Sequence, residues 1–334
     1  MAKILPVFLP FASCGNKCIF CDQQAISGVK AENNLIFLAE NQIKTWFSYS
    51  LSYDEIAFYG GNFAAVKRQD RERLYRLAYD NGLNKIRFST RPDTINNETL
   101  AEIKDYNISL VELGIQSLDN NVLEANGRPY TNMQAEKAVD DILNITDCGV
   151  QLMTGMYKQS LHSCIDDAAN LSKKNIKTAR IYPTQVLKNT VLYSMYLKGG
   201  YKGTDLADMI LAAGGMYAHF TAENVRVIRM GLPEDAADNG HIAAGAYHKS
   251  FGDIVKTFIM LLYMDMGGKV RYSGFKKTGR KLFSSNYELY PDIKISDFKD
   301  ICIEIRRNYL ENSKWFIKGK AASFACKLKS AANN

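Results

Sequence analysis

Short runs rich in β-forming residues alternate with longer amphipathic stretches over the first two-thirds of the 334-residue chain. This alternation predicts a parallel sheet built from strand–helix units, because parallel neighbours need a crossover connection between them. The expected strands are residues 5–9, 55–59, 85–89, 109–115, 150–153 and 178–182. Helices are expected between them at residues 35–47, 71–81, 96–105, 133–146 and 164–173.

Six strands predict an α/β fold, namely an open (β/α)6 partial TIM barrel with a small mixed C-terminal extension. A chain of 334 residues exceeds the size at which one core usually stops growing, so a large barrel or two domains are the natural arrangements. Beyond residue 182 the alternation loosens. Helices are expected there at residues 205–220, 251–266 and 296–310, and a strand at residues 225–229. We expect the barrel over residues 1–232 and an α/β extension over residues 233–334.

Polar and glycine residues gather where each expected strand ends. Three cysteines follow the first strand, Gly60-Gly61-Asn62 follows the second, Arg91 the third and Gln116 the fourth. In barrels of parallel strands, chemistry gathers at the C-terminal ends of the strands. The position of these residues therefore predicts a site at one end of the barrel.

Cys14, Cys18 and Cys21 offer three thiolates from one loop. Thiolates are the ligands that iron–sulfur clusters and zinc prefer. A structural zinc site needs four closed ligands, and the other cysteines are scattered, with no second CxxC or histidine pair at finger-like spacing. A redox pair of Cys18 and Cys21 leaves Cys14 without a role. A cluster with one iron open to a further ligand uses all three, but the spacing alone allows zinc, a redox dithiol or a cluster.

Several ordered motifs resemble those of radical S-adenosylmethionine (radical SAM) enzymes. The spacing C-x3-C-x2-C, with an aromatic residue before the last cysteine, is the signature of that superfamily. More narrowly, the chain resembles the radical domain of Elongator's catalytic subunit and its stand-alone bacterial relatives, through residues 11–14, 20–28, 58–63, 89–93, 111–117 and 179–183. The resemblance covers residues 4–185, and motifs at 227–232 and 245–248 extend it to about residue 250.

This resemblance implies a barrel of the radical SAM type, with a [4Fe–4S] cluster and S-adenosylmethionine as cofactors. In such enzymes three cysteines, here Cys14, Cys18 and Cys21, bind three irons, and the amino and carboxylate groups of S-adenosylmethionine chelate the fourth. An electron donor such as flavodoxin or ferredoxin reduces the cluster, and S-adenosylmethionine is cleaved into methionine and a 5′-deoxyadenosyl radical. The cofactor supplies this chemistry, while the protein fixes the geometry and excludes solvent.

The same resemblance suggests which residues contact S-adenosylmethionine. Gly60 and Gly61 match the glycine pair that hydrogen-bonds the methionine amino group through its backbone, and Asn62 stands where an acid is often found. In oxygen-independent coproporphyrinogen III oxidase, a glutamine precedes the arginine that meets the carboxylate of the cofactor. Gln116 matches this glutamine, and the same spacing places Arg128 at the arginine, whose guanidinium can clamp a carboxylate with two hydrogen bonds.

Four further residues complete the expected cofactor site. Ser89 and Gln151 fall at positions that contact the ribose, with a hydroxyl and an amide in place of the carboxylates of the oxidase relatives. Arg91 and Arg180 lie at the ends of the third and sixth expected strands. A structural ion pair is the alternative role for Arg180. No residue is assigned to catalysis itself.

The net charge of +7 is concentrated near the C-terminus. From residue 268 onward the chain has 15 Lys and Arg against 6 Asp and Glu, a net charge of +9, whereas the rest carries a net −2. Basic residues alternate there with Tyr272 and Phe275, and these residue types neutralise phosphates and stack on bases. This composition allows RNA as a partner, with a solvated surface as the alternative, and the resemblance to Elongator's catalytic subunit implies transfer RNA as the candidate RNA.

The sequence therefore predicts a radical SAM enzyme of unidentified substrate, with transfer RNA as one candidate. The alternatives are a non-catalytic iron–sulfur module that binds RNA, and a tetrapyrrole enzyme of the coproporphyrinogen oxidase type. About eighty residues follow the region of resemblance, too few for the acetyltransferase domain of Elongator's catalytic subunit. The odd number of cysteines, seven, indicates a reducing compartment. No apolar stretch approaches the ~20 residues of a membrane span, so a cytoplasmic location is expected.

Overall fold

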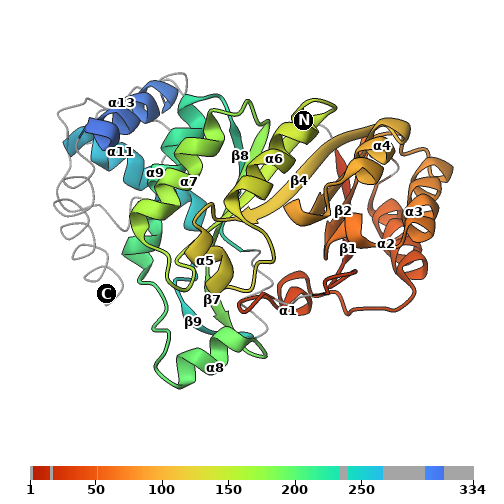
Figure 1. The fold of residues 1–334 in the computed structure, drawn as a ribbon, viewed down its shortest axis with the longest axis horizontal. Coiled ribbons are helices and arrows are strands. Elements are labelled where there is room, and N and C mark those ends of the chain that lie inside the picture. The colour runs from red at the N-terminus through yellow and green to blue at the C-terminus, as the bar shows by residue number, and fades with distance from the viewer. Residues whose placement is uncertain (1–2, 16–17, 51, 233–239, 266–297, 312–334) are drawn as a thin grey trace. The chain divides into compact units, whose positions relative to one another are not determined.

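The computed structural model describes residues 3–15, 18–50, 52–232, 240–265 and 298–311 (Figure 1). The chain divides into two compact units. The first comprises Met1–Gln151, Leu187–Met195 and Pro233–Ala243, and the second comprises Leu152–Val186, Tyr196–Leu232 and Ala244–Asn334.

Within the described residues, seven strands form one sheet in the order β1-β2-β3-β4-β5-β6-β8. They are β1 (Ile4–Leu9), β2 (Glu55–Gly60), β3 (Ile86–Thr90), β4 (Ile108–Gln116), β5 (Asp147–Thr154), β6 (Thr178–Pro183) and β8 (Arg226–Met230). The pairs β1–β2, β2–β3, β3–β4 and β6–β8 are parallel. The α/β class expected from the sequence, a partial TIM barrel, is confirmed.

The sheet has one strand more than the six expected. The sequence predicted a strand at residues 225–229 but did not predict that it belongs to the sheet. In the structure this strand is β8, which pairs with β6. This pairing occupies backbone groups of β6 that an edge strand leaves unpaired. The six expected strands were otherwise located to within three residues at either end.

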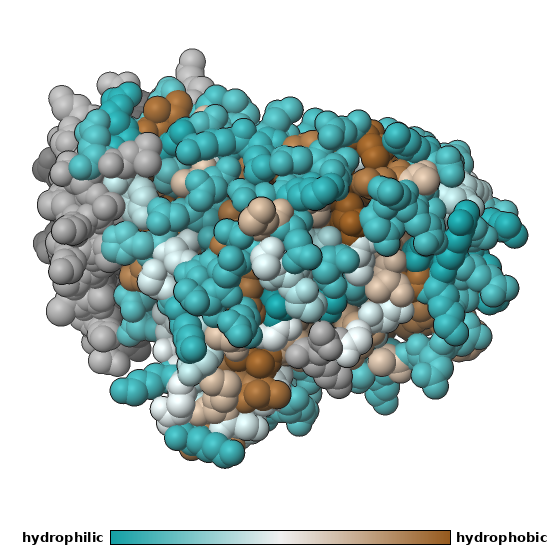
Figure 2. All heavy atoms as spheres, in the orientation of Figure 1, coloured by the Kyte–Doolittle hydropathy of each residue, from teal (hydrophilic) through white to brown (hydrophobic). Residues whose placement is uncertain are grey.

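The described part of the first unit contains several helices, some of which pack against the strands. They are α1 (Gln23–Ser27), α2 (Leu35–Tyr49), α3 (Arg68–Asp80), α4 (Asn97–Asp105), α5 (Asn120–Ala125) and α6 (Asn132–Leu143). α2 packs on β1 and beside α3 (Figure 1). Asn34, Asn96 and Thr131 cap α2, α4 and α6, and each side chain accepts a hydrogen bond from the backbone N–H three residues later. Figure 2 shows mostly hydrophilic residues over the outer side of α3.

Two short 3-10 turns follow β2 and β3 in this unit, η1 (Phe63–Ala65) and η2 (Pro92–Thr94). Phe63 of η1 stacks on Phe58 and Phe88, with ring centroids 5.2 and 4.8 Å apart. These rings form the core beneath the helices. Because side chains alternate across a strand, the neighbours of Phe58 and Phe88 on β2 and β3 face the other side of the sheet.

In the second unit, the helices pack around α9 (Leu206–Ala222). Besides β6, β8 and the end of β5, the described elements that lie wholly or partly in this unit are α7 (Leu161–Ser172), β7 (Gln185–Leu187), α8 (Val191–Leu197), β9 (Ile242–Gly245), α11 (Phe251–Asp265) and α13 (Phe298–Glu311). α9 is buried along most of its length and packs against α7, α11 and α13. β7 and β9 form a separate two-stranded sheet.

Gly215 allows α9 and α7 to approach closely. A Cβ at this position would lie 2.6 Å from Cδ1 and 2.8 Å from Cγ1 of Ile165, well inside the optimal carbon–carbon separation. We expect Gly215→Val to destabilise the protein by about 1–3 kcal/mol, the usual cost of overpacking a core. Urea unfolding measures this change. Gly252→Ala is the matched control, since a Cβ there meets Met230 at an ordinary 3.5 Å; equal midpoints for the two variants would refute the packing role of Gly215.

His219 on α9 is buried, and neither ring nitrogen has a hydrogen-bond partner among the residues that the structure describes. Its ring packs edge-on against Tyr309 of α13, with centroids 5.6 Å apart. Burial, with Arg306 and Lys173 nearby, lowers the pKa of His219 to about 4. An unfolded histidine titrates near 6.5, so between these values the unfolded chain binds a proton that the native chain does not.

Stability should therefore fall as the pH is lowered from 7 to 5, with a contribution from His219 of about 2 kcal/mol. The variant His219→Leu removes the titrating group and fills part of its volume. We expect the difference in unfolding free energy between pH 7 and pH 5 to shrink by that amount in the variant. An unchanged pH dependence would show that His219 is protonated equally in the folded and unfolded chains.

The basic region expected to contact RNA lies largely outside the described residues, because residues 266–297 and 312–334 are not among them. Tyr272, Phe275 and the lysines and arginines around them belong to this part. Within the described ranges, no helix is both long and apolar enough to cross a membrane.

Candidate cofactor site

The cysteine loop begins where β1 ends, and tight turns shape it. Phe11 and Ser13 adopt the left-handed region, with φ of 56° and 51°. The side chain of Gln23 on α1 holds the turn, since its Oε1 accepts a hydrogen bond from the backbone N–H of Phe11. Its Nε2 lies 4.0 Å from Sγ of Cys14. A single glutamine thus joins the first turn of the loop to the first cysteine.

Cys14, Cys18 and Cys21 are partly buried, and none forms a disulfide. Burial, together with the charges of the neighbouring thiols, raises the pKa of Cys14 and of Cys21. Each group of three His, Cys, Asp or Glu side chains in the described residues is too dispersed to hold one metal ion. Zinc at about 2.3 Å from each sulfur needs such convergence, whereas in a cluster each cysteine binds a different iron. Three thiols from one loop are a donor set that fits a cluster with one iron open.

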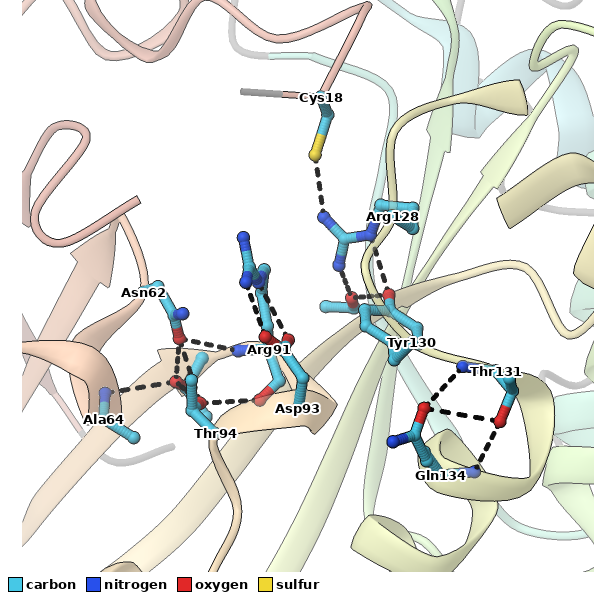
Figure 3. Close-up of polar contacts among 12 residues, drawn as sticks. Cys18, Asn62, Ala64, Arg91, Asp93, Thr94, Arg128, Tyr130, Thr131 and Gln134 are labelled. Atoms are coloured by element: carbon cyan, nitrogen blue, oxygen red, sulfur yellow. Dashed lines mark hydrogen bonds and ion pairs between the residues drawn. The ribbon is translucent and has the colours of Figure 1, made fainter. Parts of the chain in front are cut away.

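Arg128, 110 residues after Cys18, reaches the cysteine loop (Figure 3). Its Nη1 donates to Sγ of Cys18 at 3.0 Å, Nε donates to the Tyr130 hydroxyl at 2.8 Å, and Nη2 donates to the carbonyl of Gly114. Burial alone would lower the pKa of Arg128. The interactions of its guanidinium with Tyr130 and Cys18 outweigh this effect, so the pKa of Arg128 is raised. The resemblance suggested a carboxylate clamp; here three N–H donors of Arg128 have partners within the protein.

The glycine pair lies at the end of β2, where the cysteine loop passes directly over it. A Cβ on Gly60 would lie 2.8 Å from the carbonyl oxygen of Leu9, and a Cβ on Gly61 would overlap the backbone of Ala12. Gly60 also has a φ of 95°. Both glycines are therefore required by the path of the loop, whether or not a ligand contacts them.

Asn62 is fully buried and joins the ends of β2 and β3 (Figure 3). Its Oδ1 accepts hydrogen bonds from the Thr90 hydroxyl at 2.6 Å, the Thr94 hydroxyl at 3.0 Å and the Arg91 backbone N–H at 3.1 Å. An acid at this position would serve the same donors. The side chain of Asn62 thus holds the chain around Arg91 in place.

Two buried polar atoms among the candidate residues have no partner within the described part of the chain. Arg91 uses Nε and Nη2 on the carboxylate of Asp93, at 2.9 and 2.5 Å, but its Nη1 is unpaired. Figure 3 shows this end of Arg91 turned toward the region of Cys18 and Arg128. Gln116, which ends β4 with a φ of 67°, has an unpaired Oε1. Buried unpaired groups of this kind call for a ligand or a water molecule.

A polar network lies deeper, on the face of the strands opposite the aromatic core. Nε2 of Gln151 donates to the Ser89 hydroxyl and to the Glu112 carboxylate, both at 3.2 Å. The Tyr59 hydroxyl donates to the other oxygen of Glu112 at 3.3 Å. Sequence reasoning selected Ser89 and Gln151 but missed Glu112 and Tyr59. A charged residue within the otherwise apolar run of β4 was the signal available for Glu112.

Arg180 does not belong to the same unit as the other candidate residues. It lies on β6 in the second unit, where its Nη1 approaches the Tyr182 hydroxyl at 3.5 Å. All other expected cofactor residues, and the three cysteines, lie in the first unit. They come from the loop after β1, from the ends of β2, β3 and β4 or the residues just after them, from the middle of β5 (Gln151) and from the segment between α5 and α6 (Arg128).

Two family patterns match the chain in succession: the Radical SAM superfamily over residues 8–170 and the radical SAM C-terminal domain over residues 176–259. This chain belongs to the radical SAM superfamily. The match contains the three cysteines and every candidate residue of the first unit. The radical SAM pattern thus spans the candidate site, and the C-terminal pattern extends into the second unit.

The similar proteins include members of the Elongator family. An uncharacterized protein of Methanocaldococcus jannaschii is 27% identical over 204 residues, which is 56% of this chain and 62% of that protein. Elongator complex protein 3 of Mus musculus is 20% identical over 245 residues, covering 59% of this chain and 44% of that protein. The chain thus spans about half the length of the Elongator relatives it matches.

A solved structure supports the same fold. The archaeal Elp3 of Methanocaldococcus infernus, with residues 1–46 deleted, superposes with a TM-score of 0.60 at 17% identity. The superposition covers 81% of this chain and 65% of that one. At this identity the likeness establishes a shared fold.

Proposed function

We propose that this chain is a radical SAM enzyme, in which Cys14, Cys18 and Cys21 hold a [4Fe–4S] cluster and S-adenosylmethionine binds beside it. The observation that carries the proposal is that three thiols lie in one loop and that the guanidinium of Arg128 donates a hydrogen bond to one of them, Cys18. When bound, the cluster and S-adenosylmethionine supply a 5′-deoxyadenosyl radical. An external electron donor, such as a flavodoxin or a ferredoxin, provides the electron.

The unpaired atoms of Arg91 and Gln116 suit the ends of S-adenosylmethionine. The methionine moiety carries a carboxylate, which accepts hydrogen bonds, and an amino group, whose N–H bonds can be donated even when its nitrogen binds iron. Within the described residues, Nη1 of Arg91 is a buried donor and Oε1 of Gln116 a buried acceptor, each without a partner. We therefore assign Arg91 to the carboxylate and Gln116 to the amino group, with the backbone of Gly60 and Gly61 near the latter.

The network of Ser89, Gln151 and Glu112 suits the ribose. A ribose offers two adjacent hydroxyls, each of which both donates and accepts. Ser89 and Glu112 provide acceptors, and the amide of Gln151 already orients both of them. Ser89, Gln151 and Glu112 lie on the face of the sheet opposite the aromatic core. Asn62 acts by holding the segment of Arg91 in position.

The substrate class that we propose is RNA. It rests on the resemblance to the Elongator family and on the basic composition from residue 268 onward. Phosphate neutralisation by Lys and Arg makes RNA affinity fall steeply with salt. A tetrapyrrole substrate and a non-catalytic RNA-binding module are the competing outcomes of the test below.

The test is an anaerobic assay of the reconstituted, reduced protein with S-adenosylmethionine. We expect 5′-deoxyadenosine and methionine to form, and bulk transfer RNA, but not a porphyrinogen, to accelerate their formation. Stimulation by the porphyrinogen alone would overturn the RNA assignment. RNA binding without any cleavage above that of Cys18→Ala would favour the non-catalytic module and contradict the enzyme.

A further inference from the structure

The guanidinium of Arg128 is fixed against Cys18 from several directions. Tyr130 holds Nε at 2.8 Å, and Tyr130 in turn donates to the carbonyls of Gly114 and Ile115 at 2.9 and 2.8 Å. Nη2 bonds the Gly114 carbonyl. The plane of the guanidinium is thus set by the end of β4, independently of the cysteine it reaches.

The backbone holds the cysteine loop to the same region. The N–H of Ile19, the residue after Cys18, donates to the carbonyl of Asn126 at 3.3 Å, and Asn126 lies two residues before Arg128. The two segments are therefore joined by a bond that does not involve the sulfur. The contact of 3.0 Å between Nη1 and Sγ of Cys18 follows from this backbone arrangement.

We propose that Arg128 is a positioning residue that tunes the cluster: it donates an N–H···S hydrogen bond to Cys18 and so raises the reduction potential. The inference rests on the proposed function, since it takes Cys18 as a cluster ligand. It differs from the role expected from the resemblance, in which this arginine clamps the carboxylate of S-adenosylmethionine.

The direction of the effect follows from charge. An oxidised cluster with three thiolate ligands is already anionic, and a one-electron reduction makes it more so. A buried guanidinium that donates to one of the sulfurs stabilises the reduced form more than the oxidised form. Hydrogen bonds to the sulfurs are among the features that set the potentials of iron–sulfur clusters. Loss of the Arg128 contact should therefore make the cluster harder to reduce.

The test is a dithionite titration of the reconstituted full chain, monitored by EPR without S-adenosylmethionine. Arg128→Gln should lower the ratio of reduced to oxidised cluster at a fixed potential about tenfold, a shift of about 59 mV for a one-electron couple. Tyr130→Phe should give a smaller shift in the same direction, because it frees Nε only. Arg91→Gln controls for the loss of a nearby positive charge without the loss of a hydrogen bond to sulfur, because Arg91 hydrogen-bonds Asp93 and no described cysteine; its shift should be smaller than that of Arg128→Gln.

A second measurement covers the case in which Arg128→Gln fails to fold. Electron–nuclear double resonance of the reduced wild-type protein, labelled with 15N-arginine, should detect coupling between the cluster and an arginine nitrogen. Absence of this coupling, or a shift in Arg91→Gln as large as in Arg128→Gln, would overturn the inference. If the wild-type protein binds no cluster, the proposed function is wrong. If it binds a cluster whose reduction potential is the same in Arg128→Gln, only this inference is wrong.

Discussion

Replacing Cys14, Cys18 or Cys21 with Ala should abolish assembly of the cluster. Each of these thiols would bind a different iron, so the two thiols that remain are too few to retain the cluster. After anaerobic reconstitution we expect about four irons per chain in the wild-type protein and fewer than about one in each variant. Iron and sulfide analysis, with the visible absorption of the cluster, measures this loss.

Cys148→Ala is the matched control for these variants. Cys148 lies on β5, is fully buried and makes no disulfide, so its replacement removes a thiol without touching the loop. We expect it to retain the full iron content. If Cys148→Ala loses as much iron as Cys18→Ala, or if a loop variant keeps its iron, the assignment of the ligands is wrong.

Glu102→Ala should destabilise the protein by about 3–5 kcal/mol, because it leaves a buried arginine charge without its partner. Nε of Arg71 donates to Oε2 of Glu102 at 2.8 Å, and the two side chains are only 6% and 4% exposed. Nη1 of Arg71 donates to the carbonyls of Ala64 and Val66. The pair therefore also holds η1, the turn that directly follows Asn62.

The control for this variant acts on the same arginine. Glu98 also reaches Arg71, at 3.4 Å, but its side chain is 52% exposed. Glu98→Ala should cost less than about 1 kcal/mol, as is usual for surface ion pairs. Urea unfolding compares the two. Equal losses of stability in the two variants would contradict the view that burial makes the Arg71–Glu102 pair contribute more to stability than an exposed pair does.

The sequence predicted the repeating elements of the fold well, because strands and helices are local patterns. The six strands and the helices between them lie close to their expected residues. β7 and β9 were missed because three or four residues give too little periodicity to detect. β8 was recognised as a strand, but its partner was not, since pairing with β6 depends on contacts between distant parts of the chain.

The candidate site was predictable in its members but not in their contacts. The cysteines, the glycine pair and Gln116 stand out by type and by their place at strand ends. Nothing in the sequence indicated that Arg128 donates to Cys18, or that Asn62 serves three donors from β3 and η2. Glu112 was passed over because a single acid within a strand carries no spacing pattern. Such contacts become visible only in three dimensions.

The central claim is that the three cysteines hold a cluster with one iron open to S-adenosylmethionine. EPR spectra of the reduced, reconstituted protein, recorded with and without S-adenosylmethionine, test it most directly. We predict a [4Fe–4S] signal whose g values change when S-adenosylmethionine is added, because its amino and carboxylate groups then bind the open iron. A cluster signal that is identical in both spectra would contradict the claim.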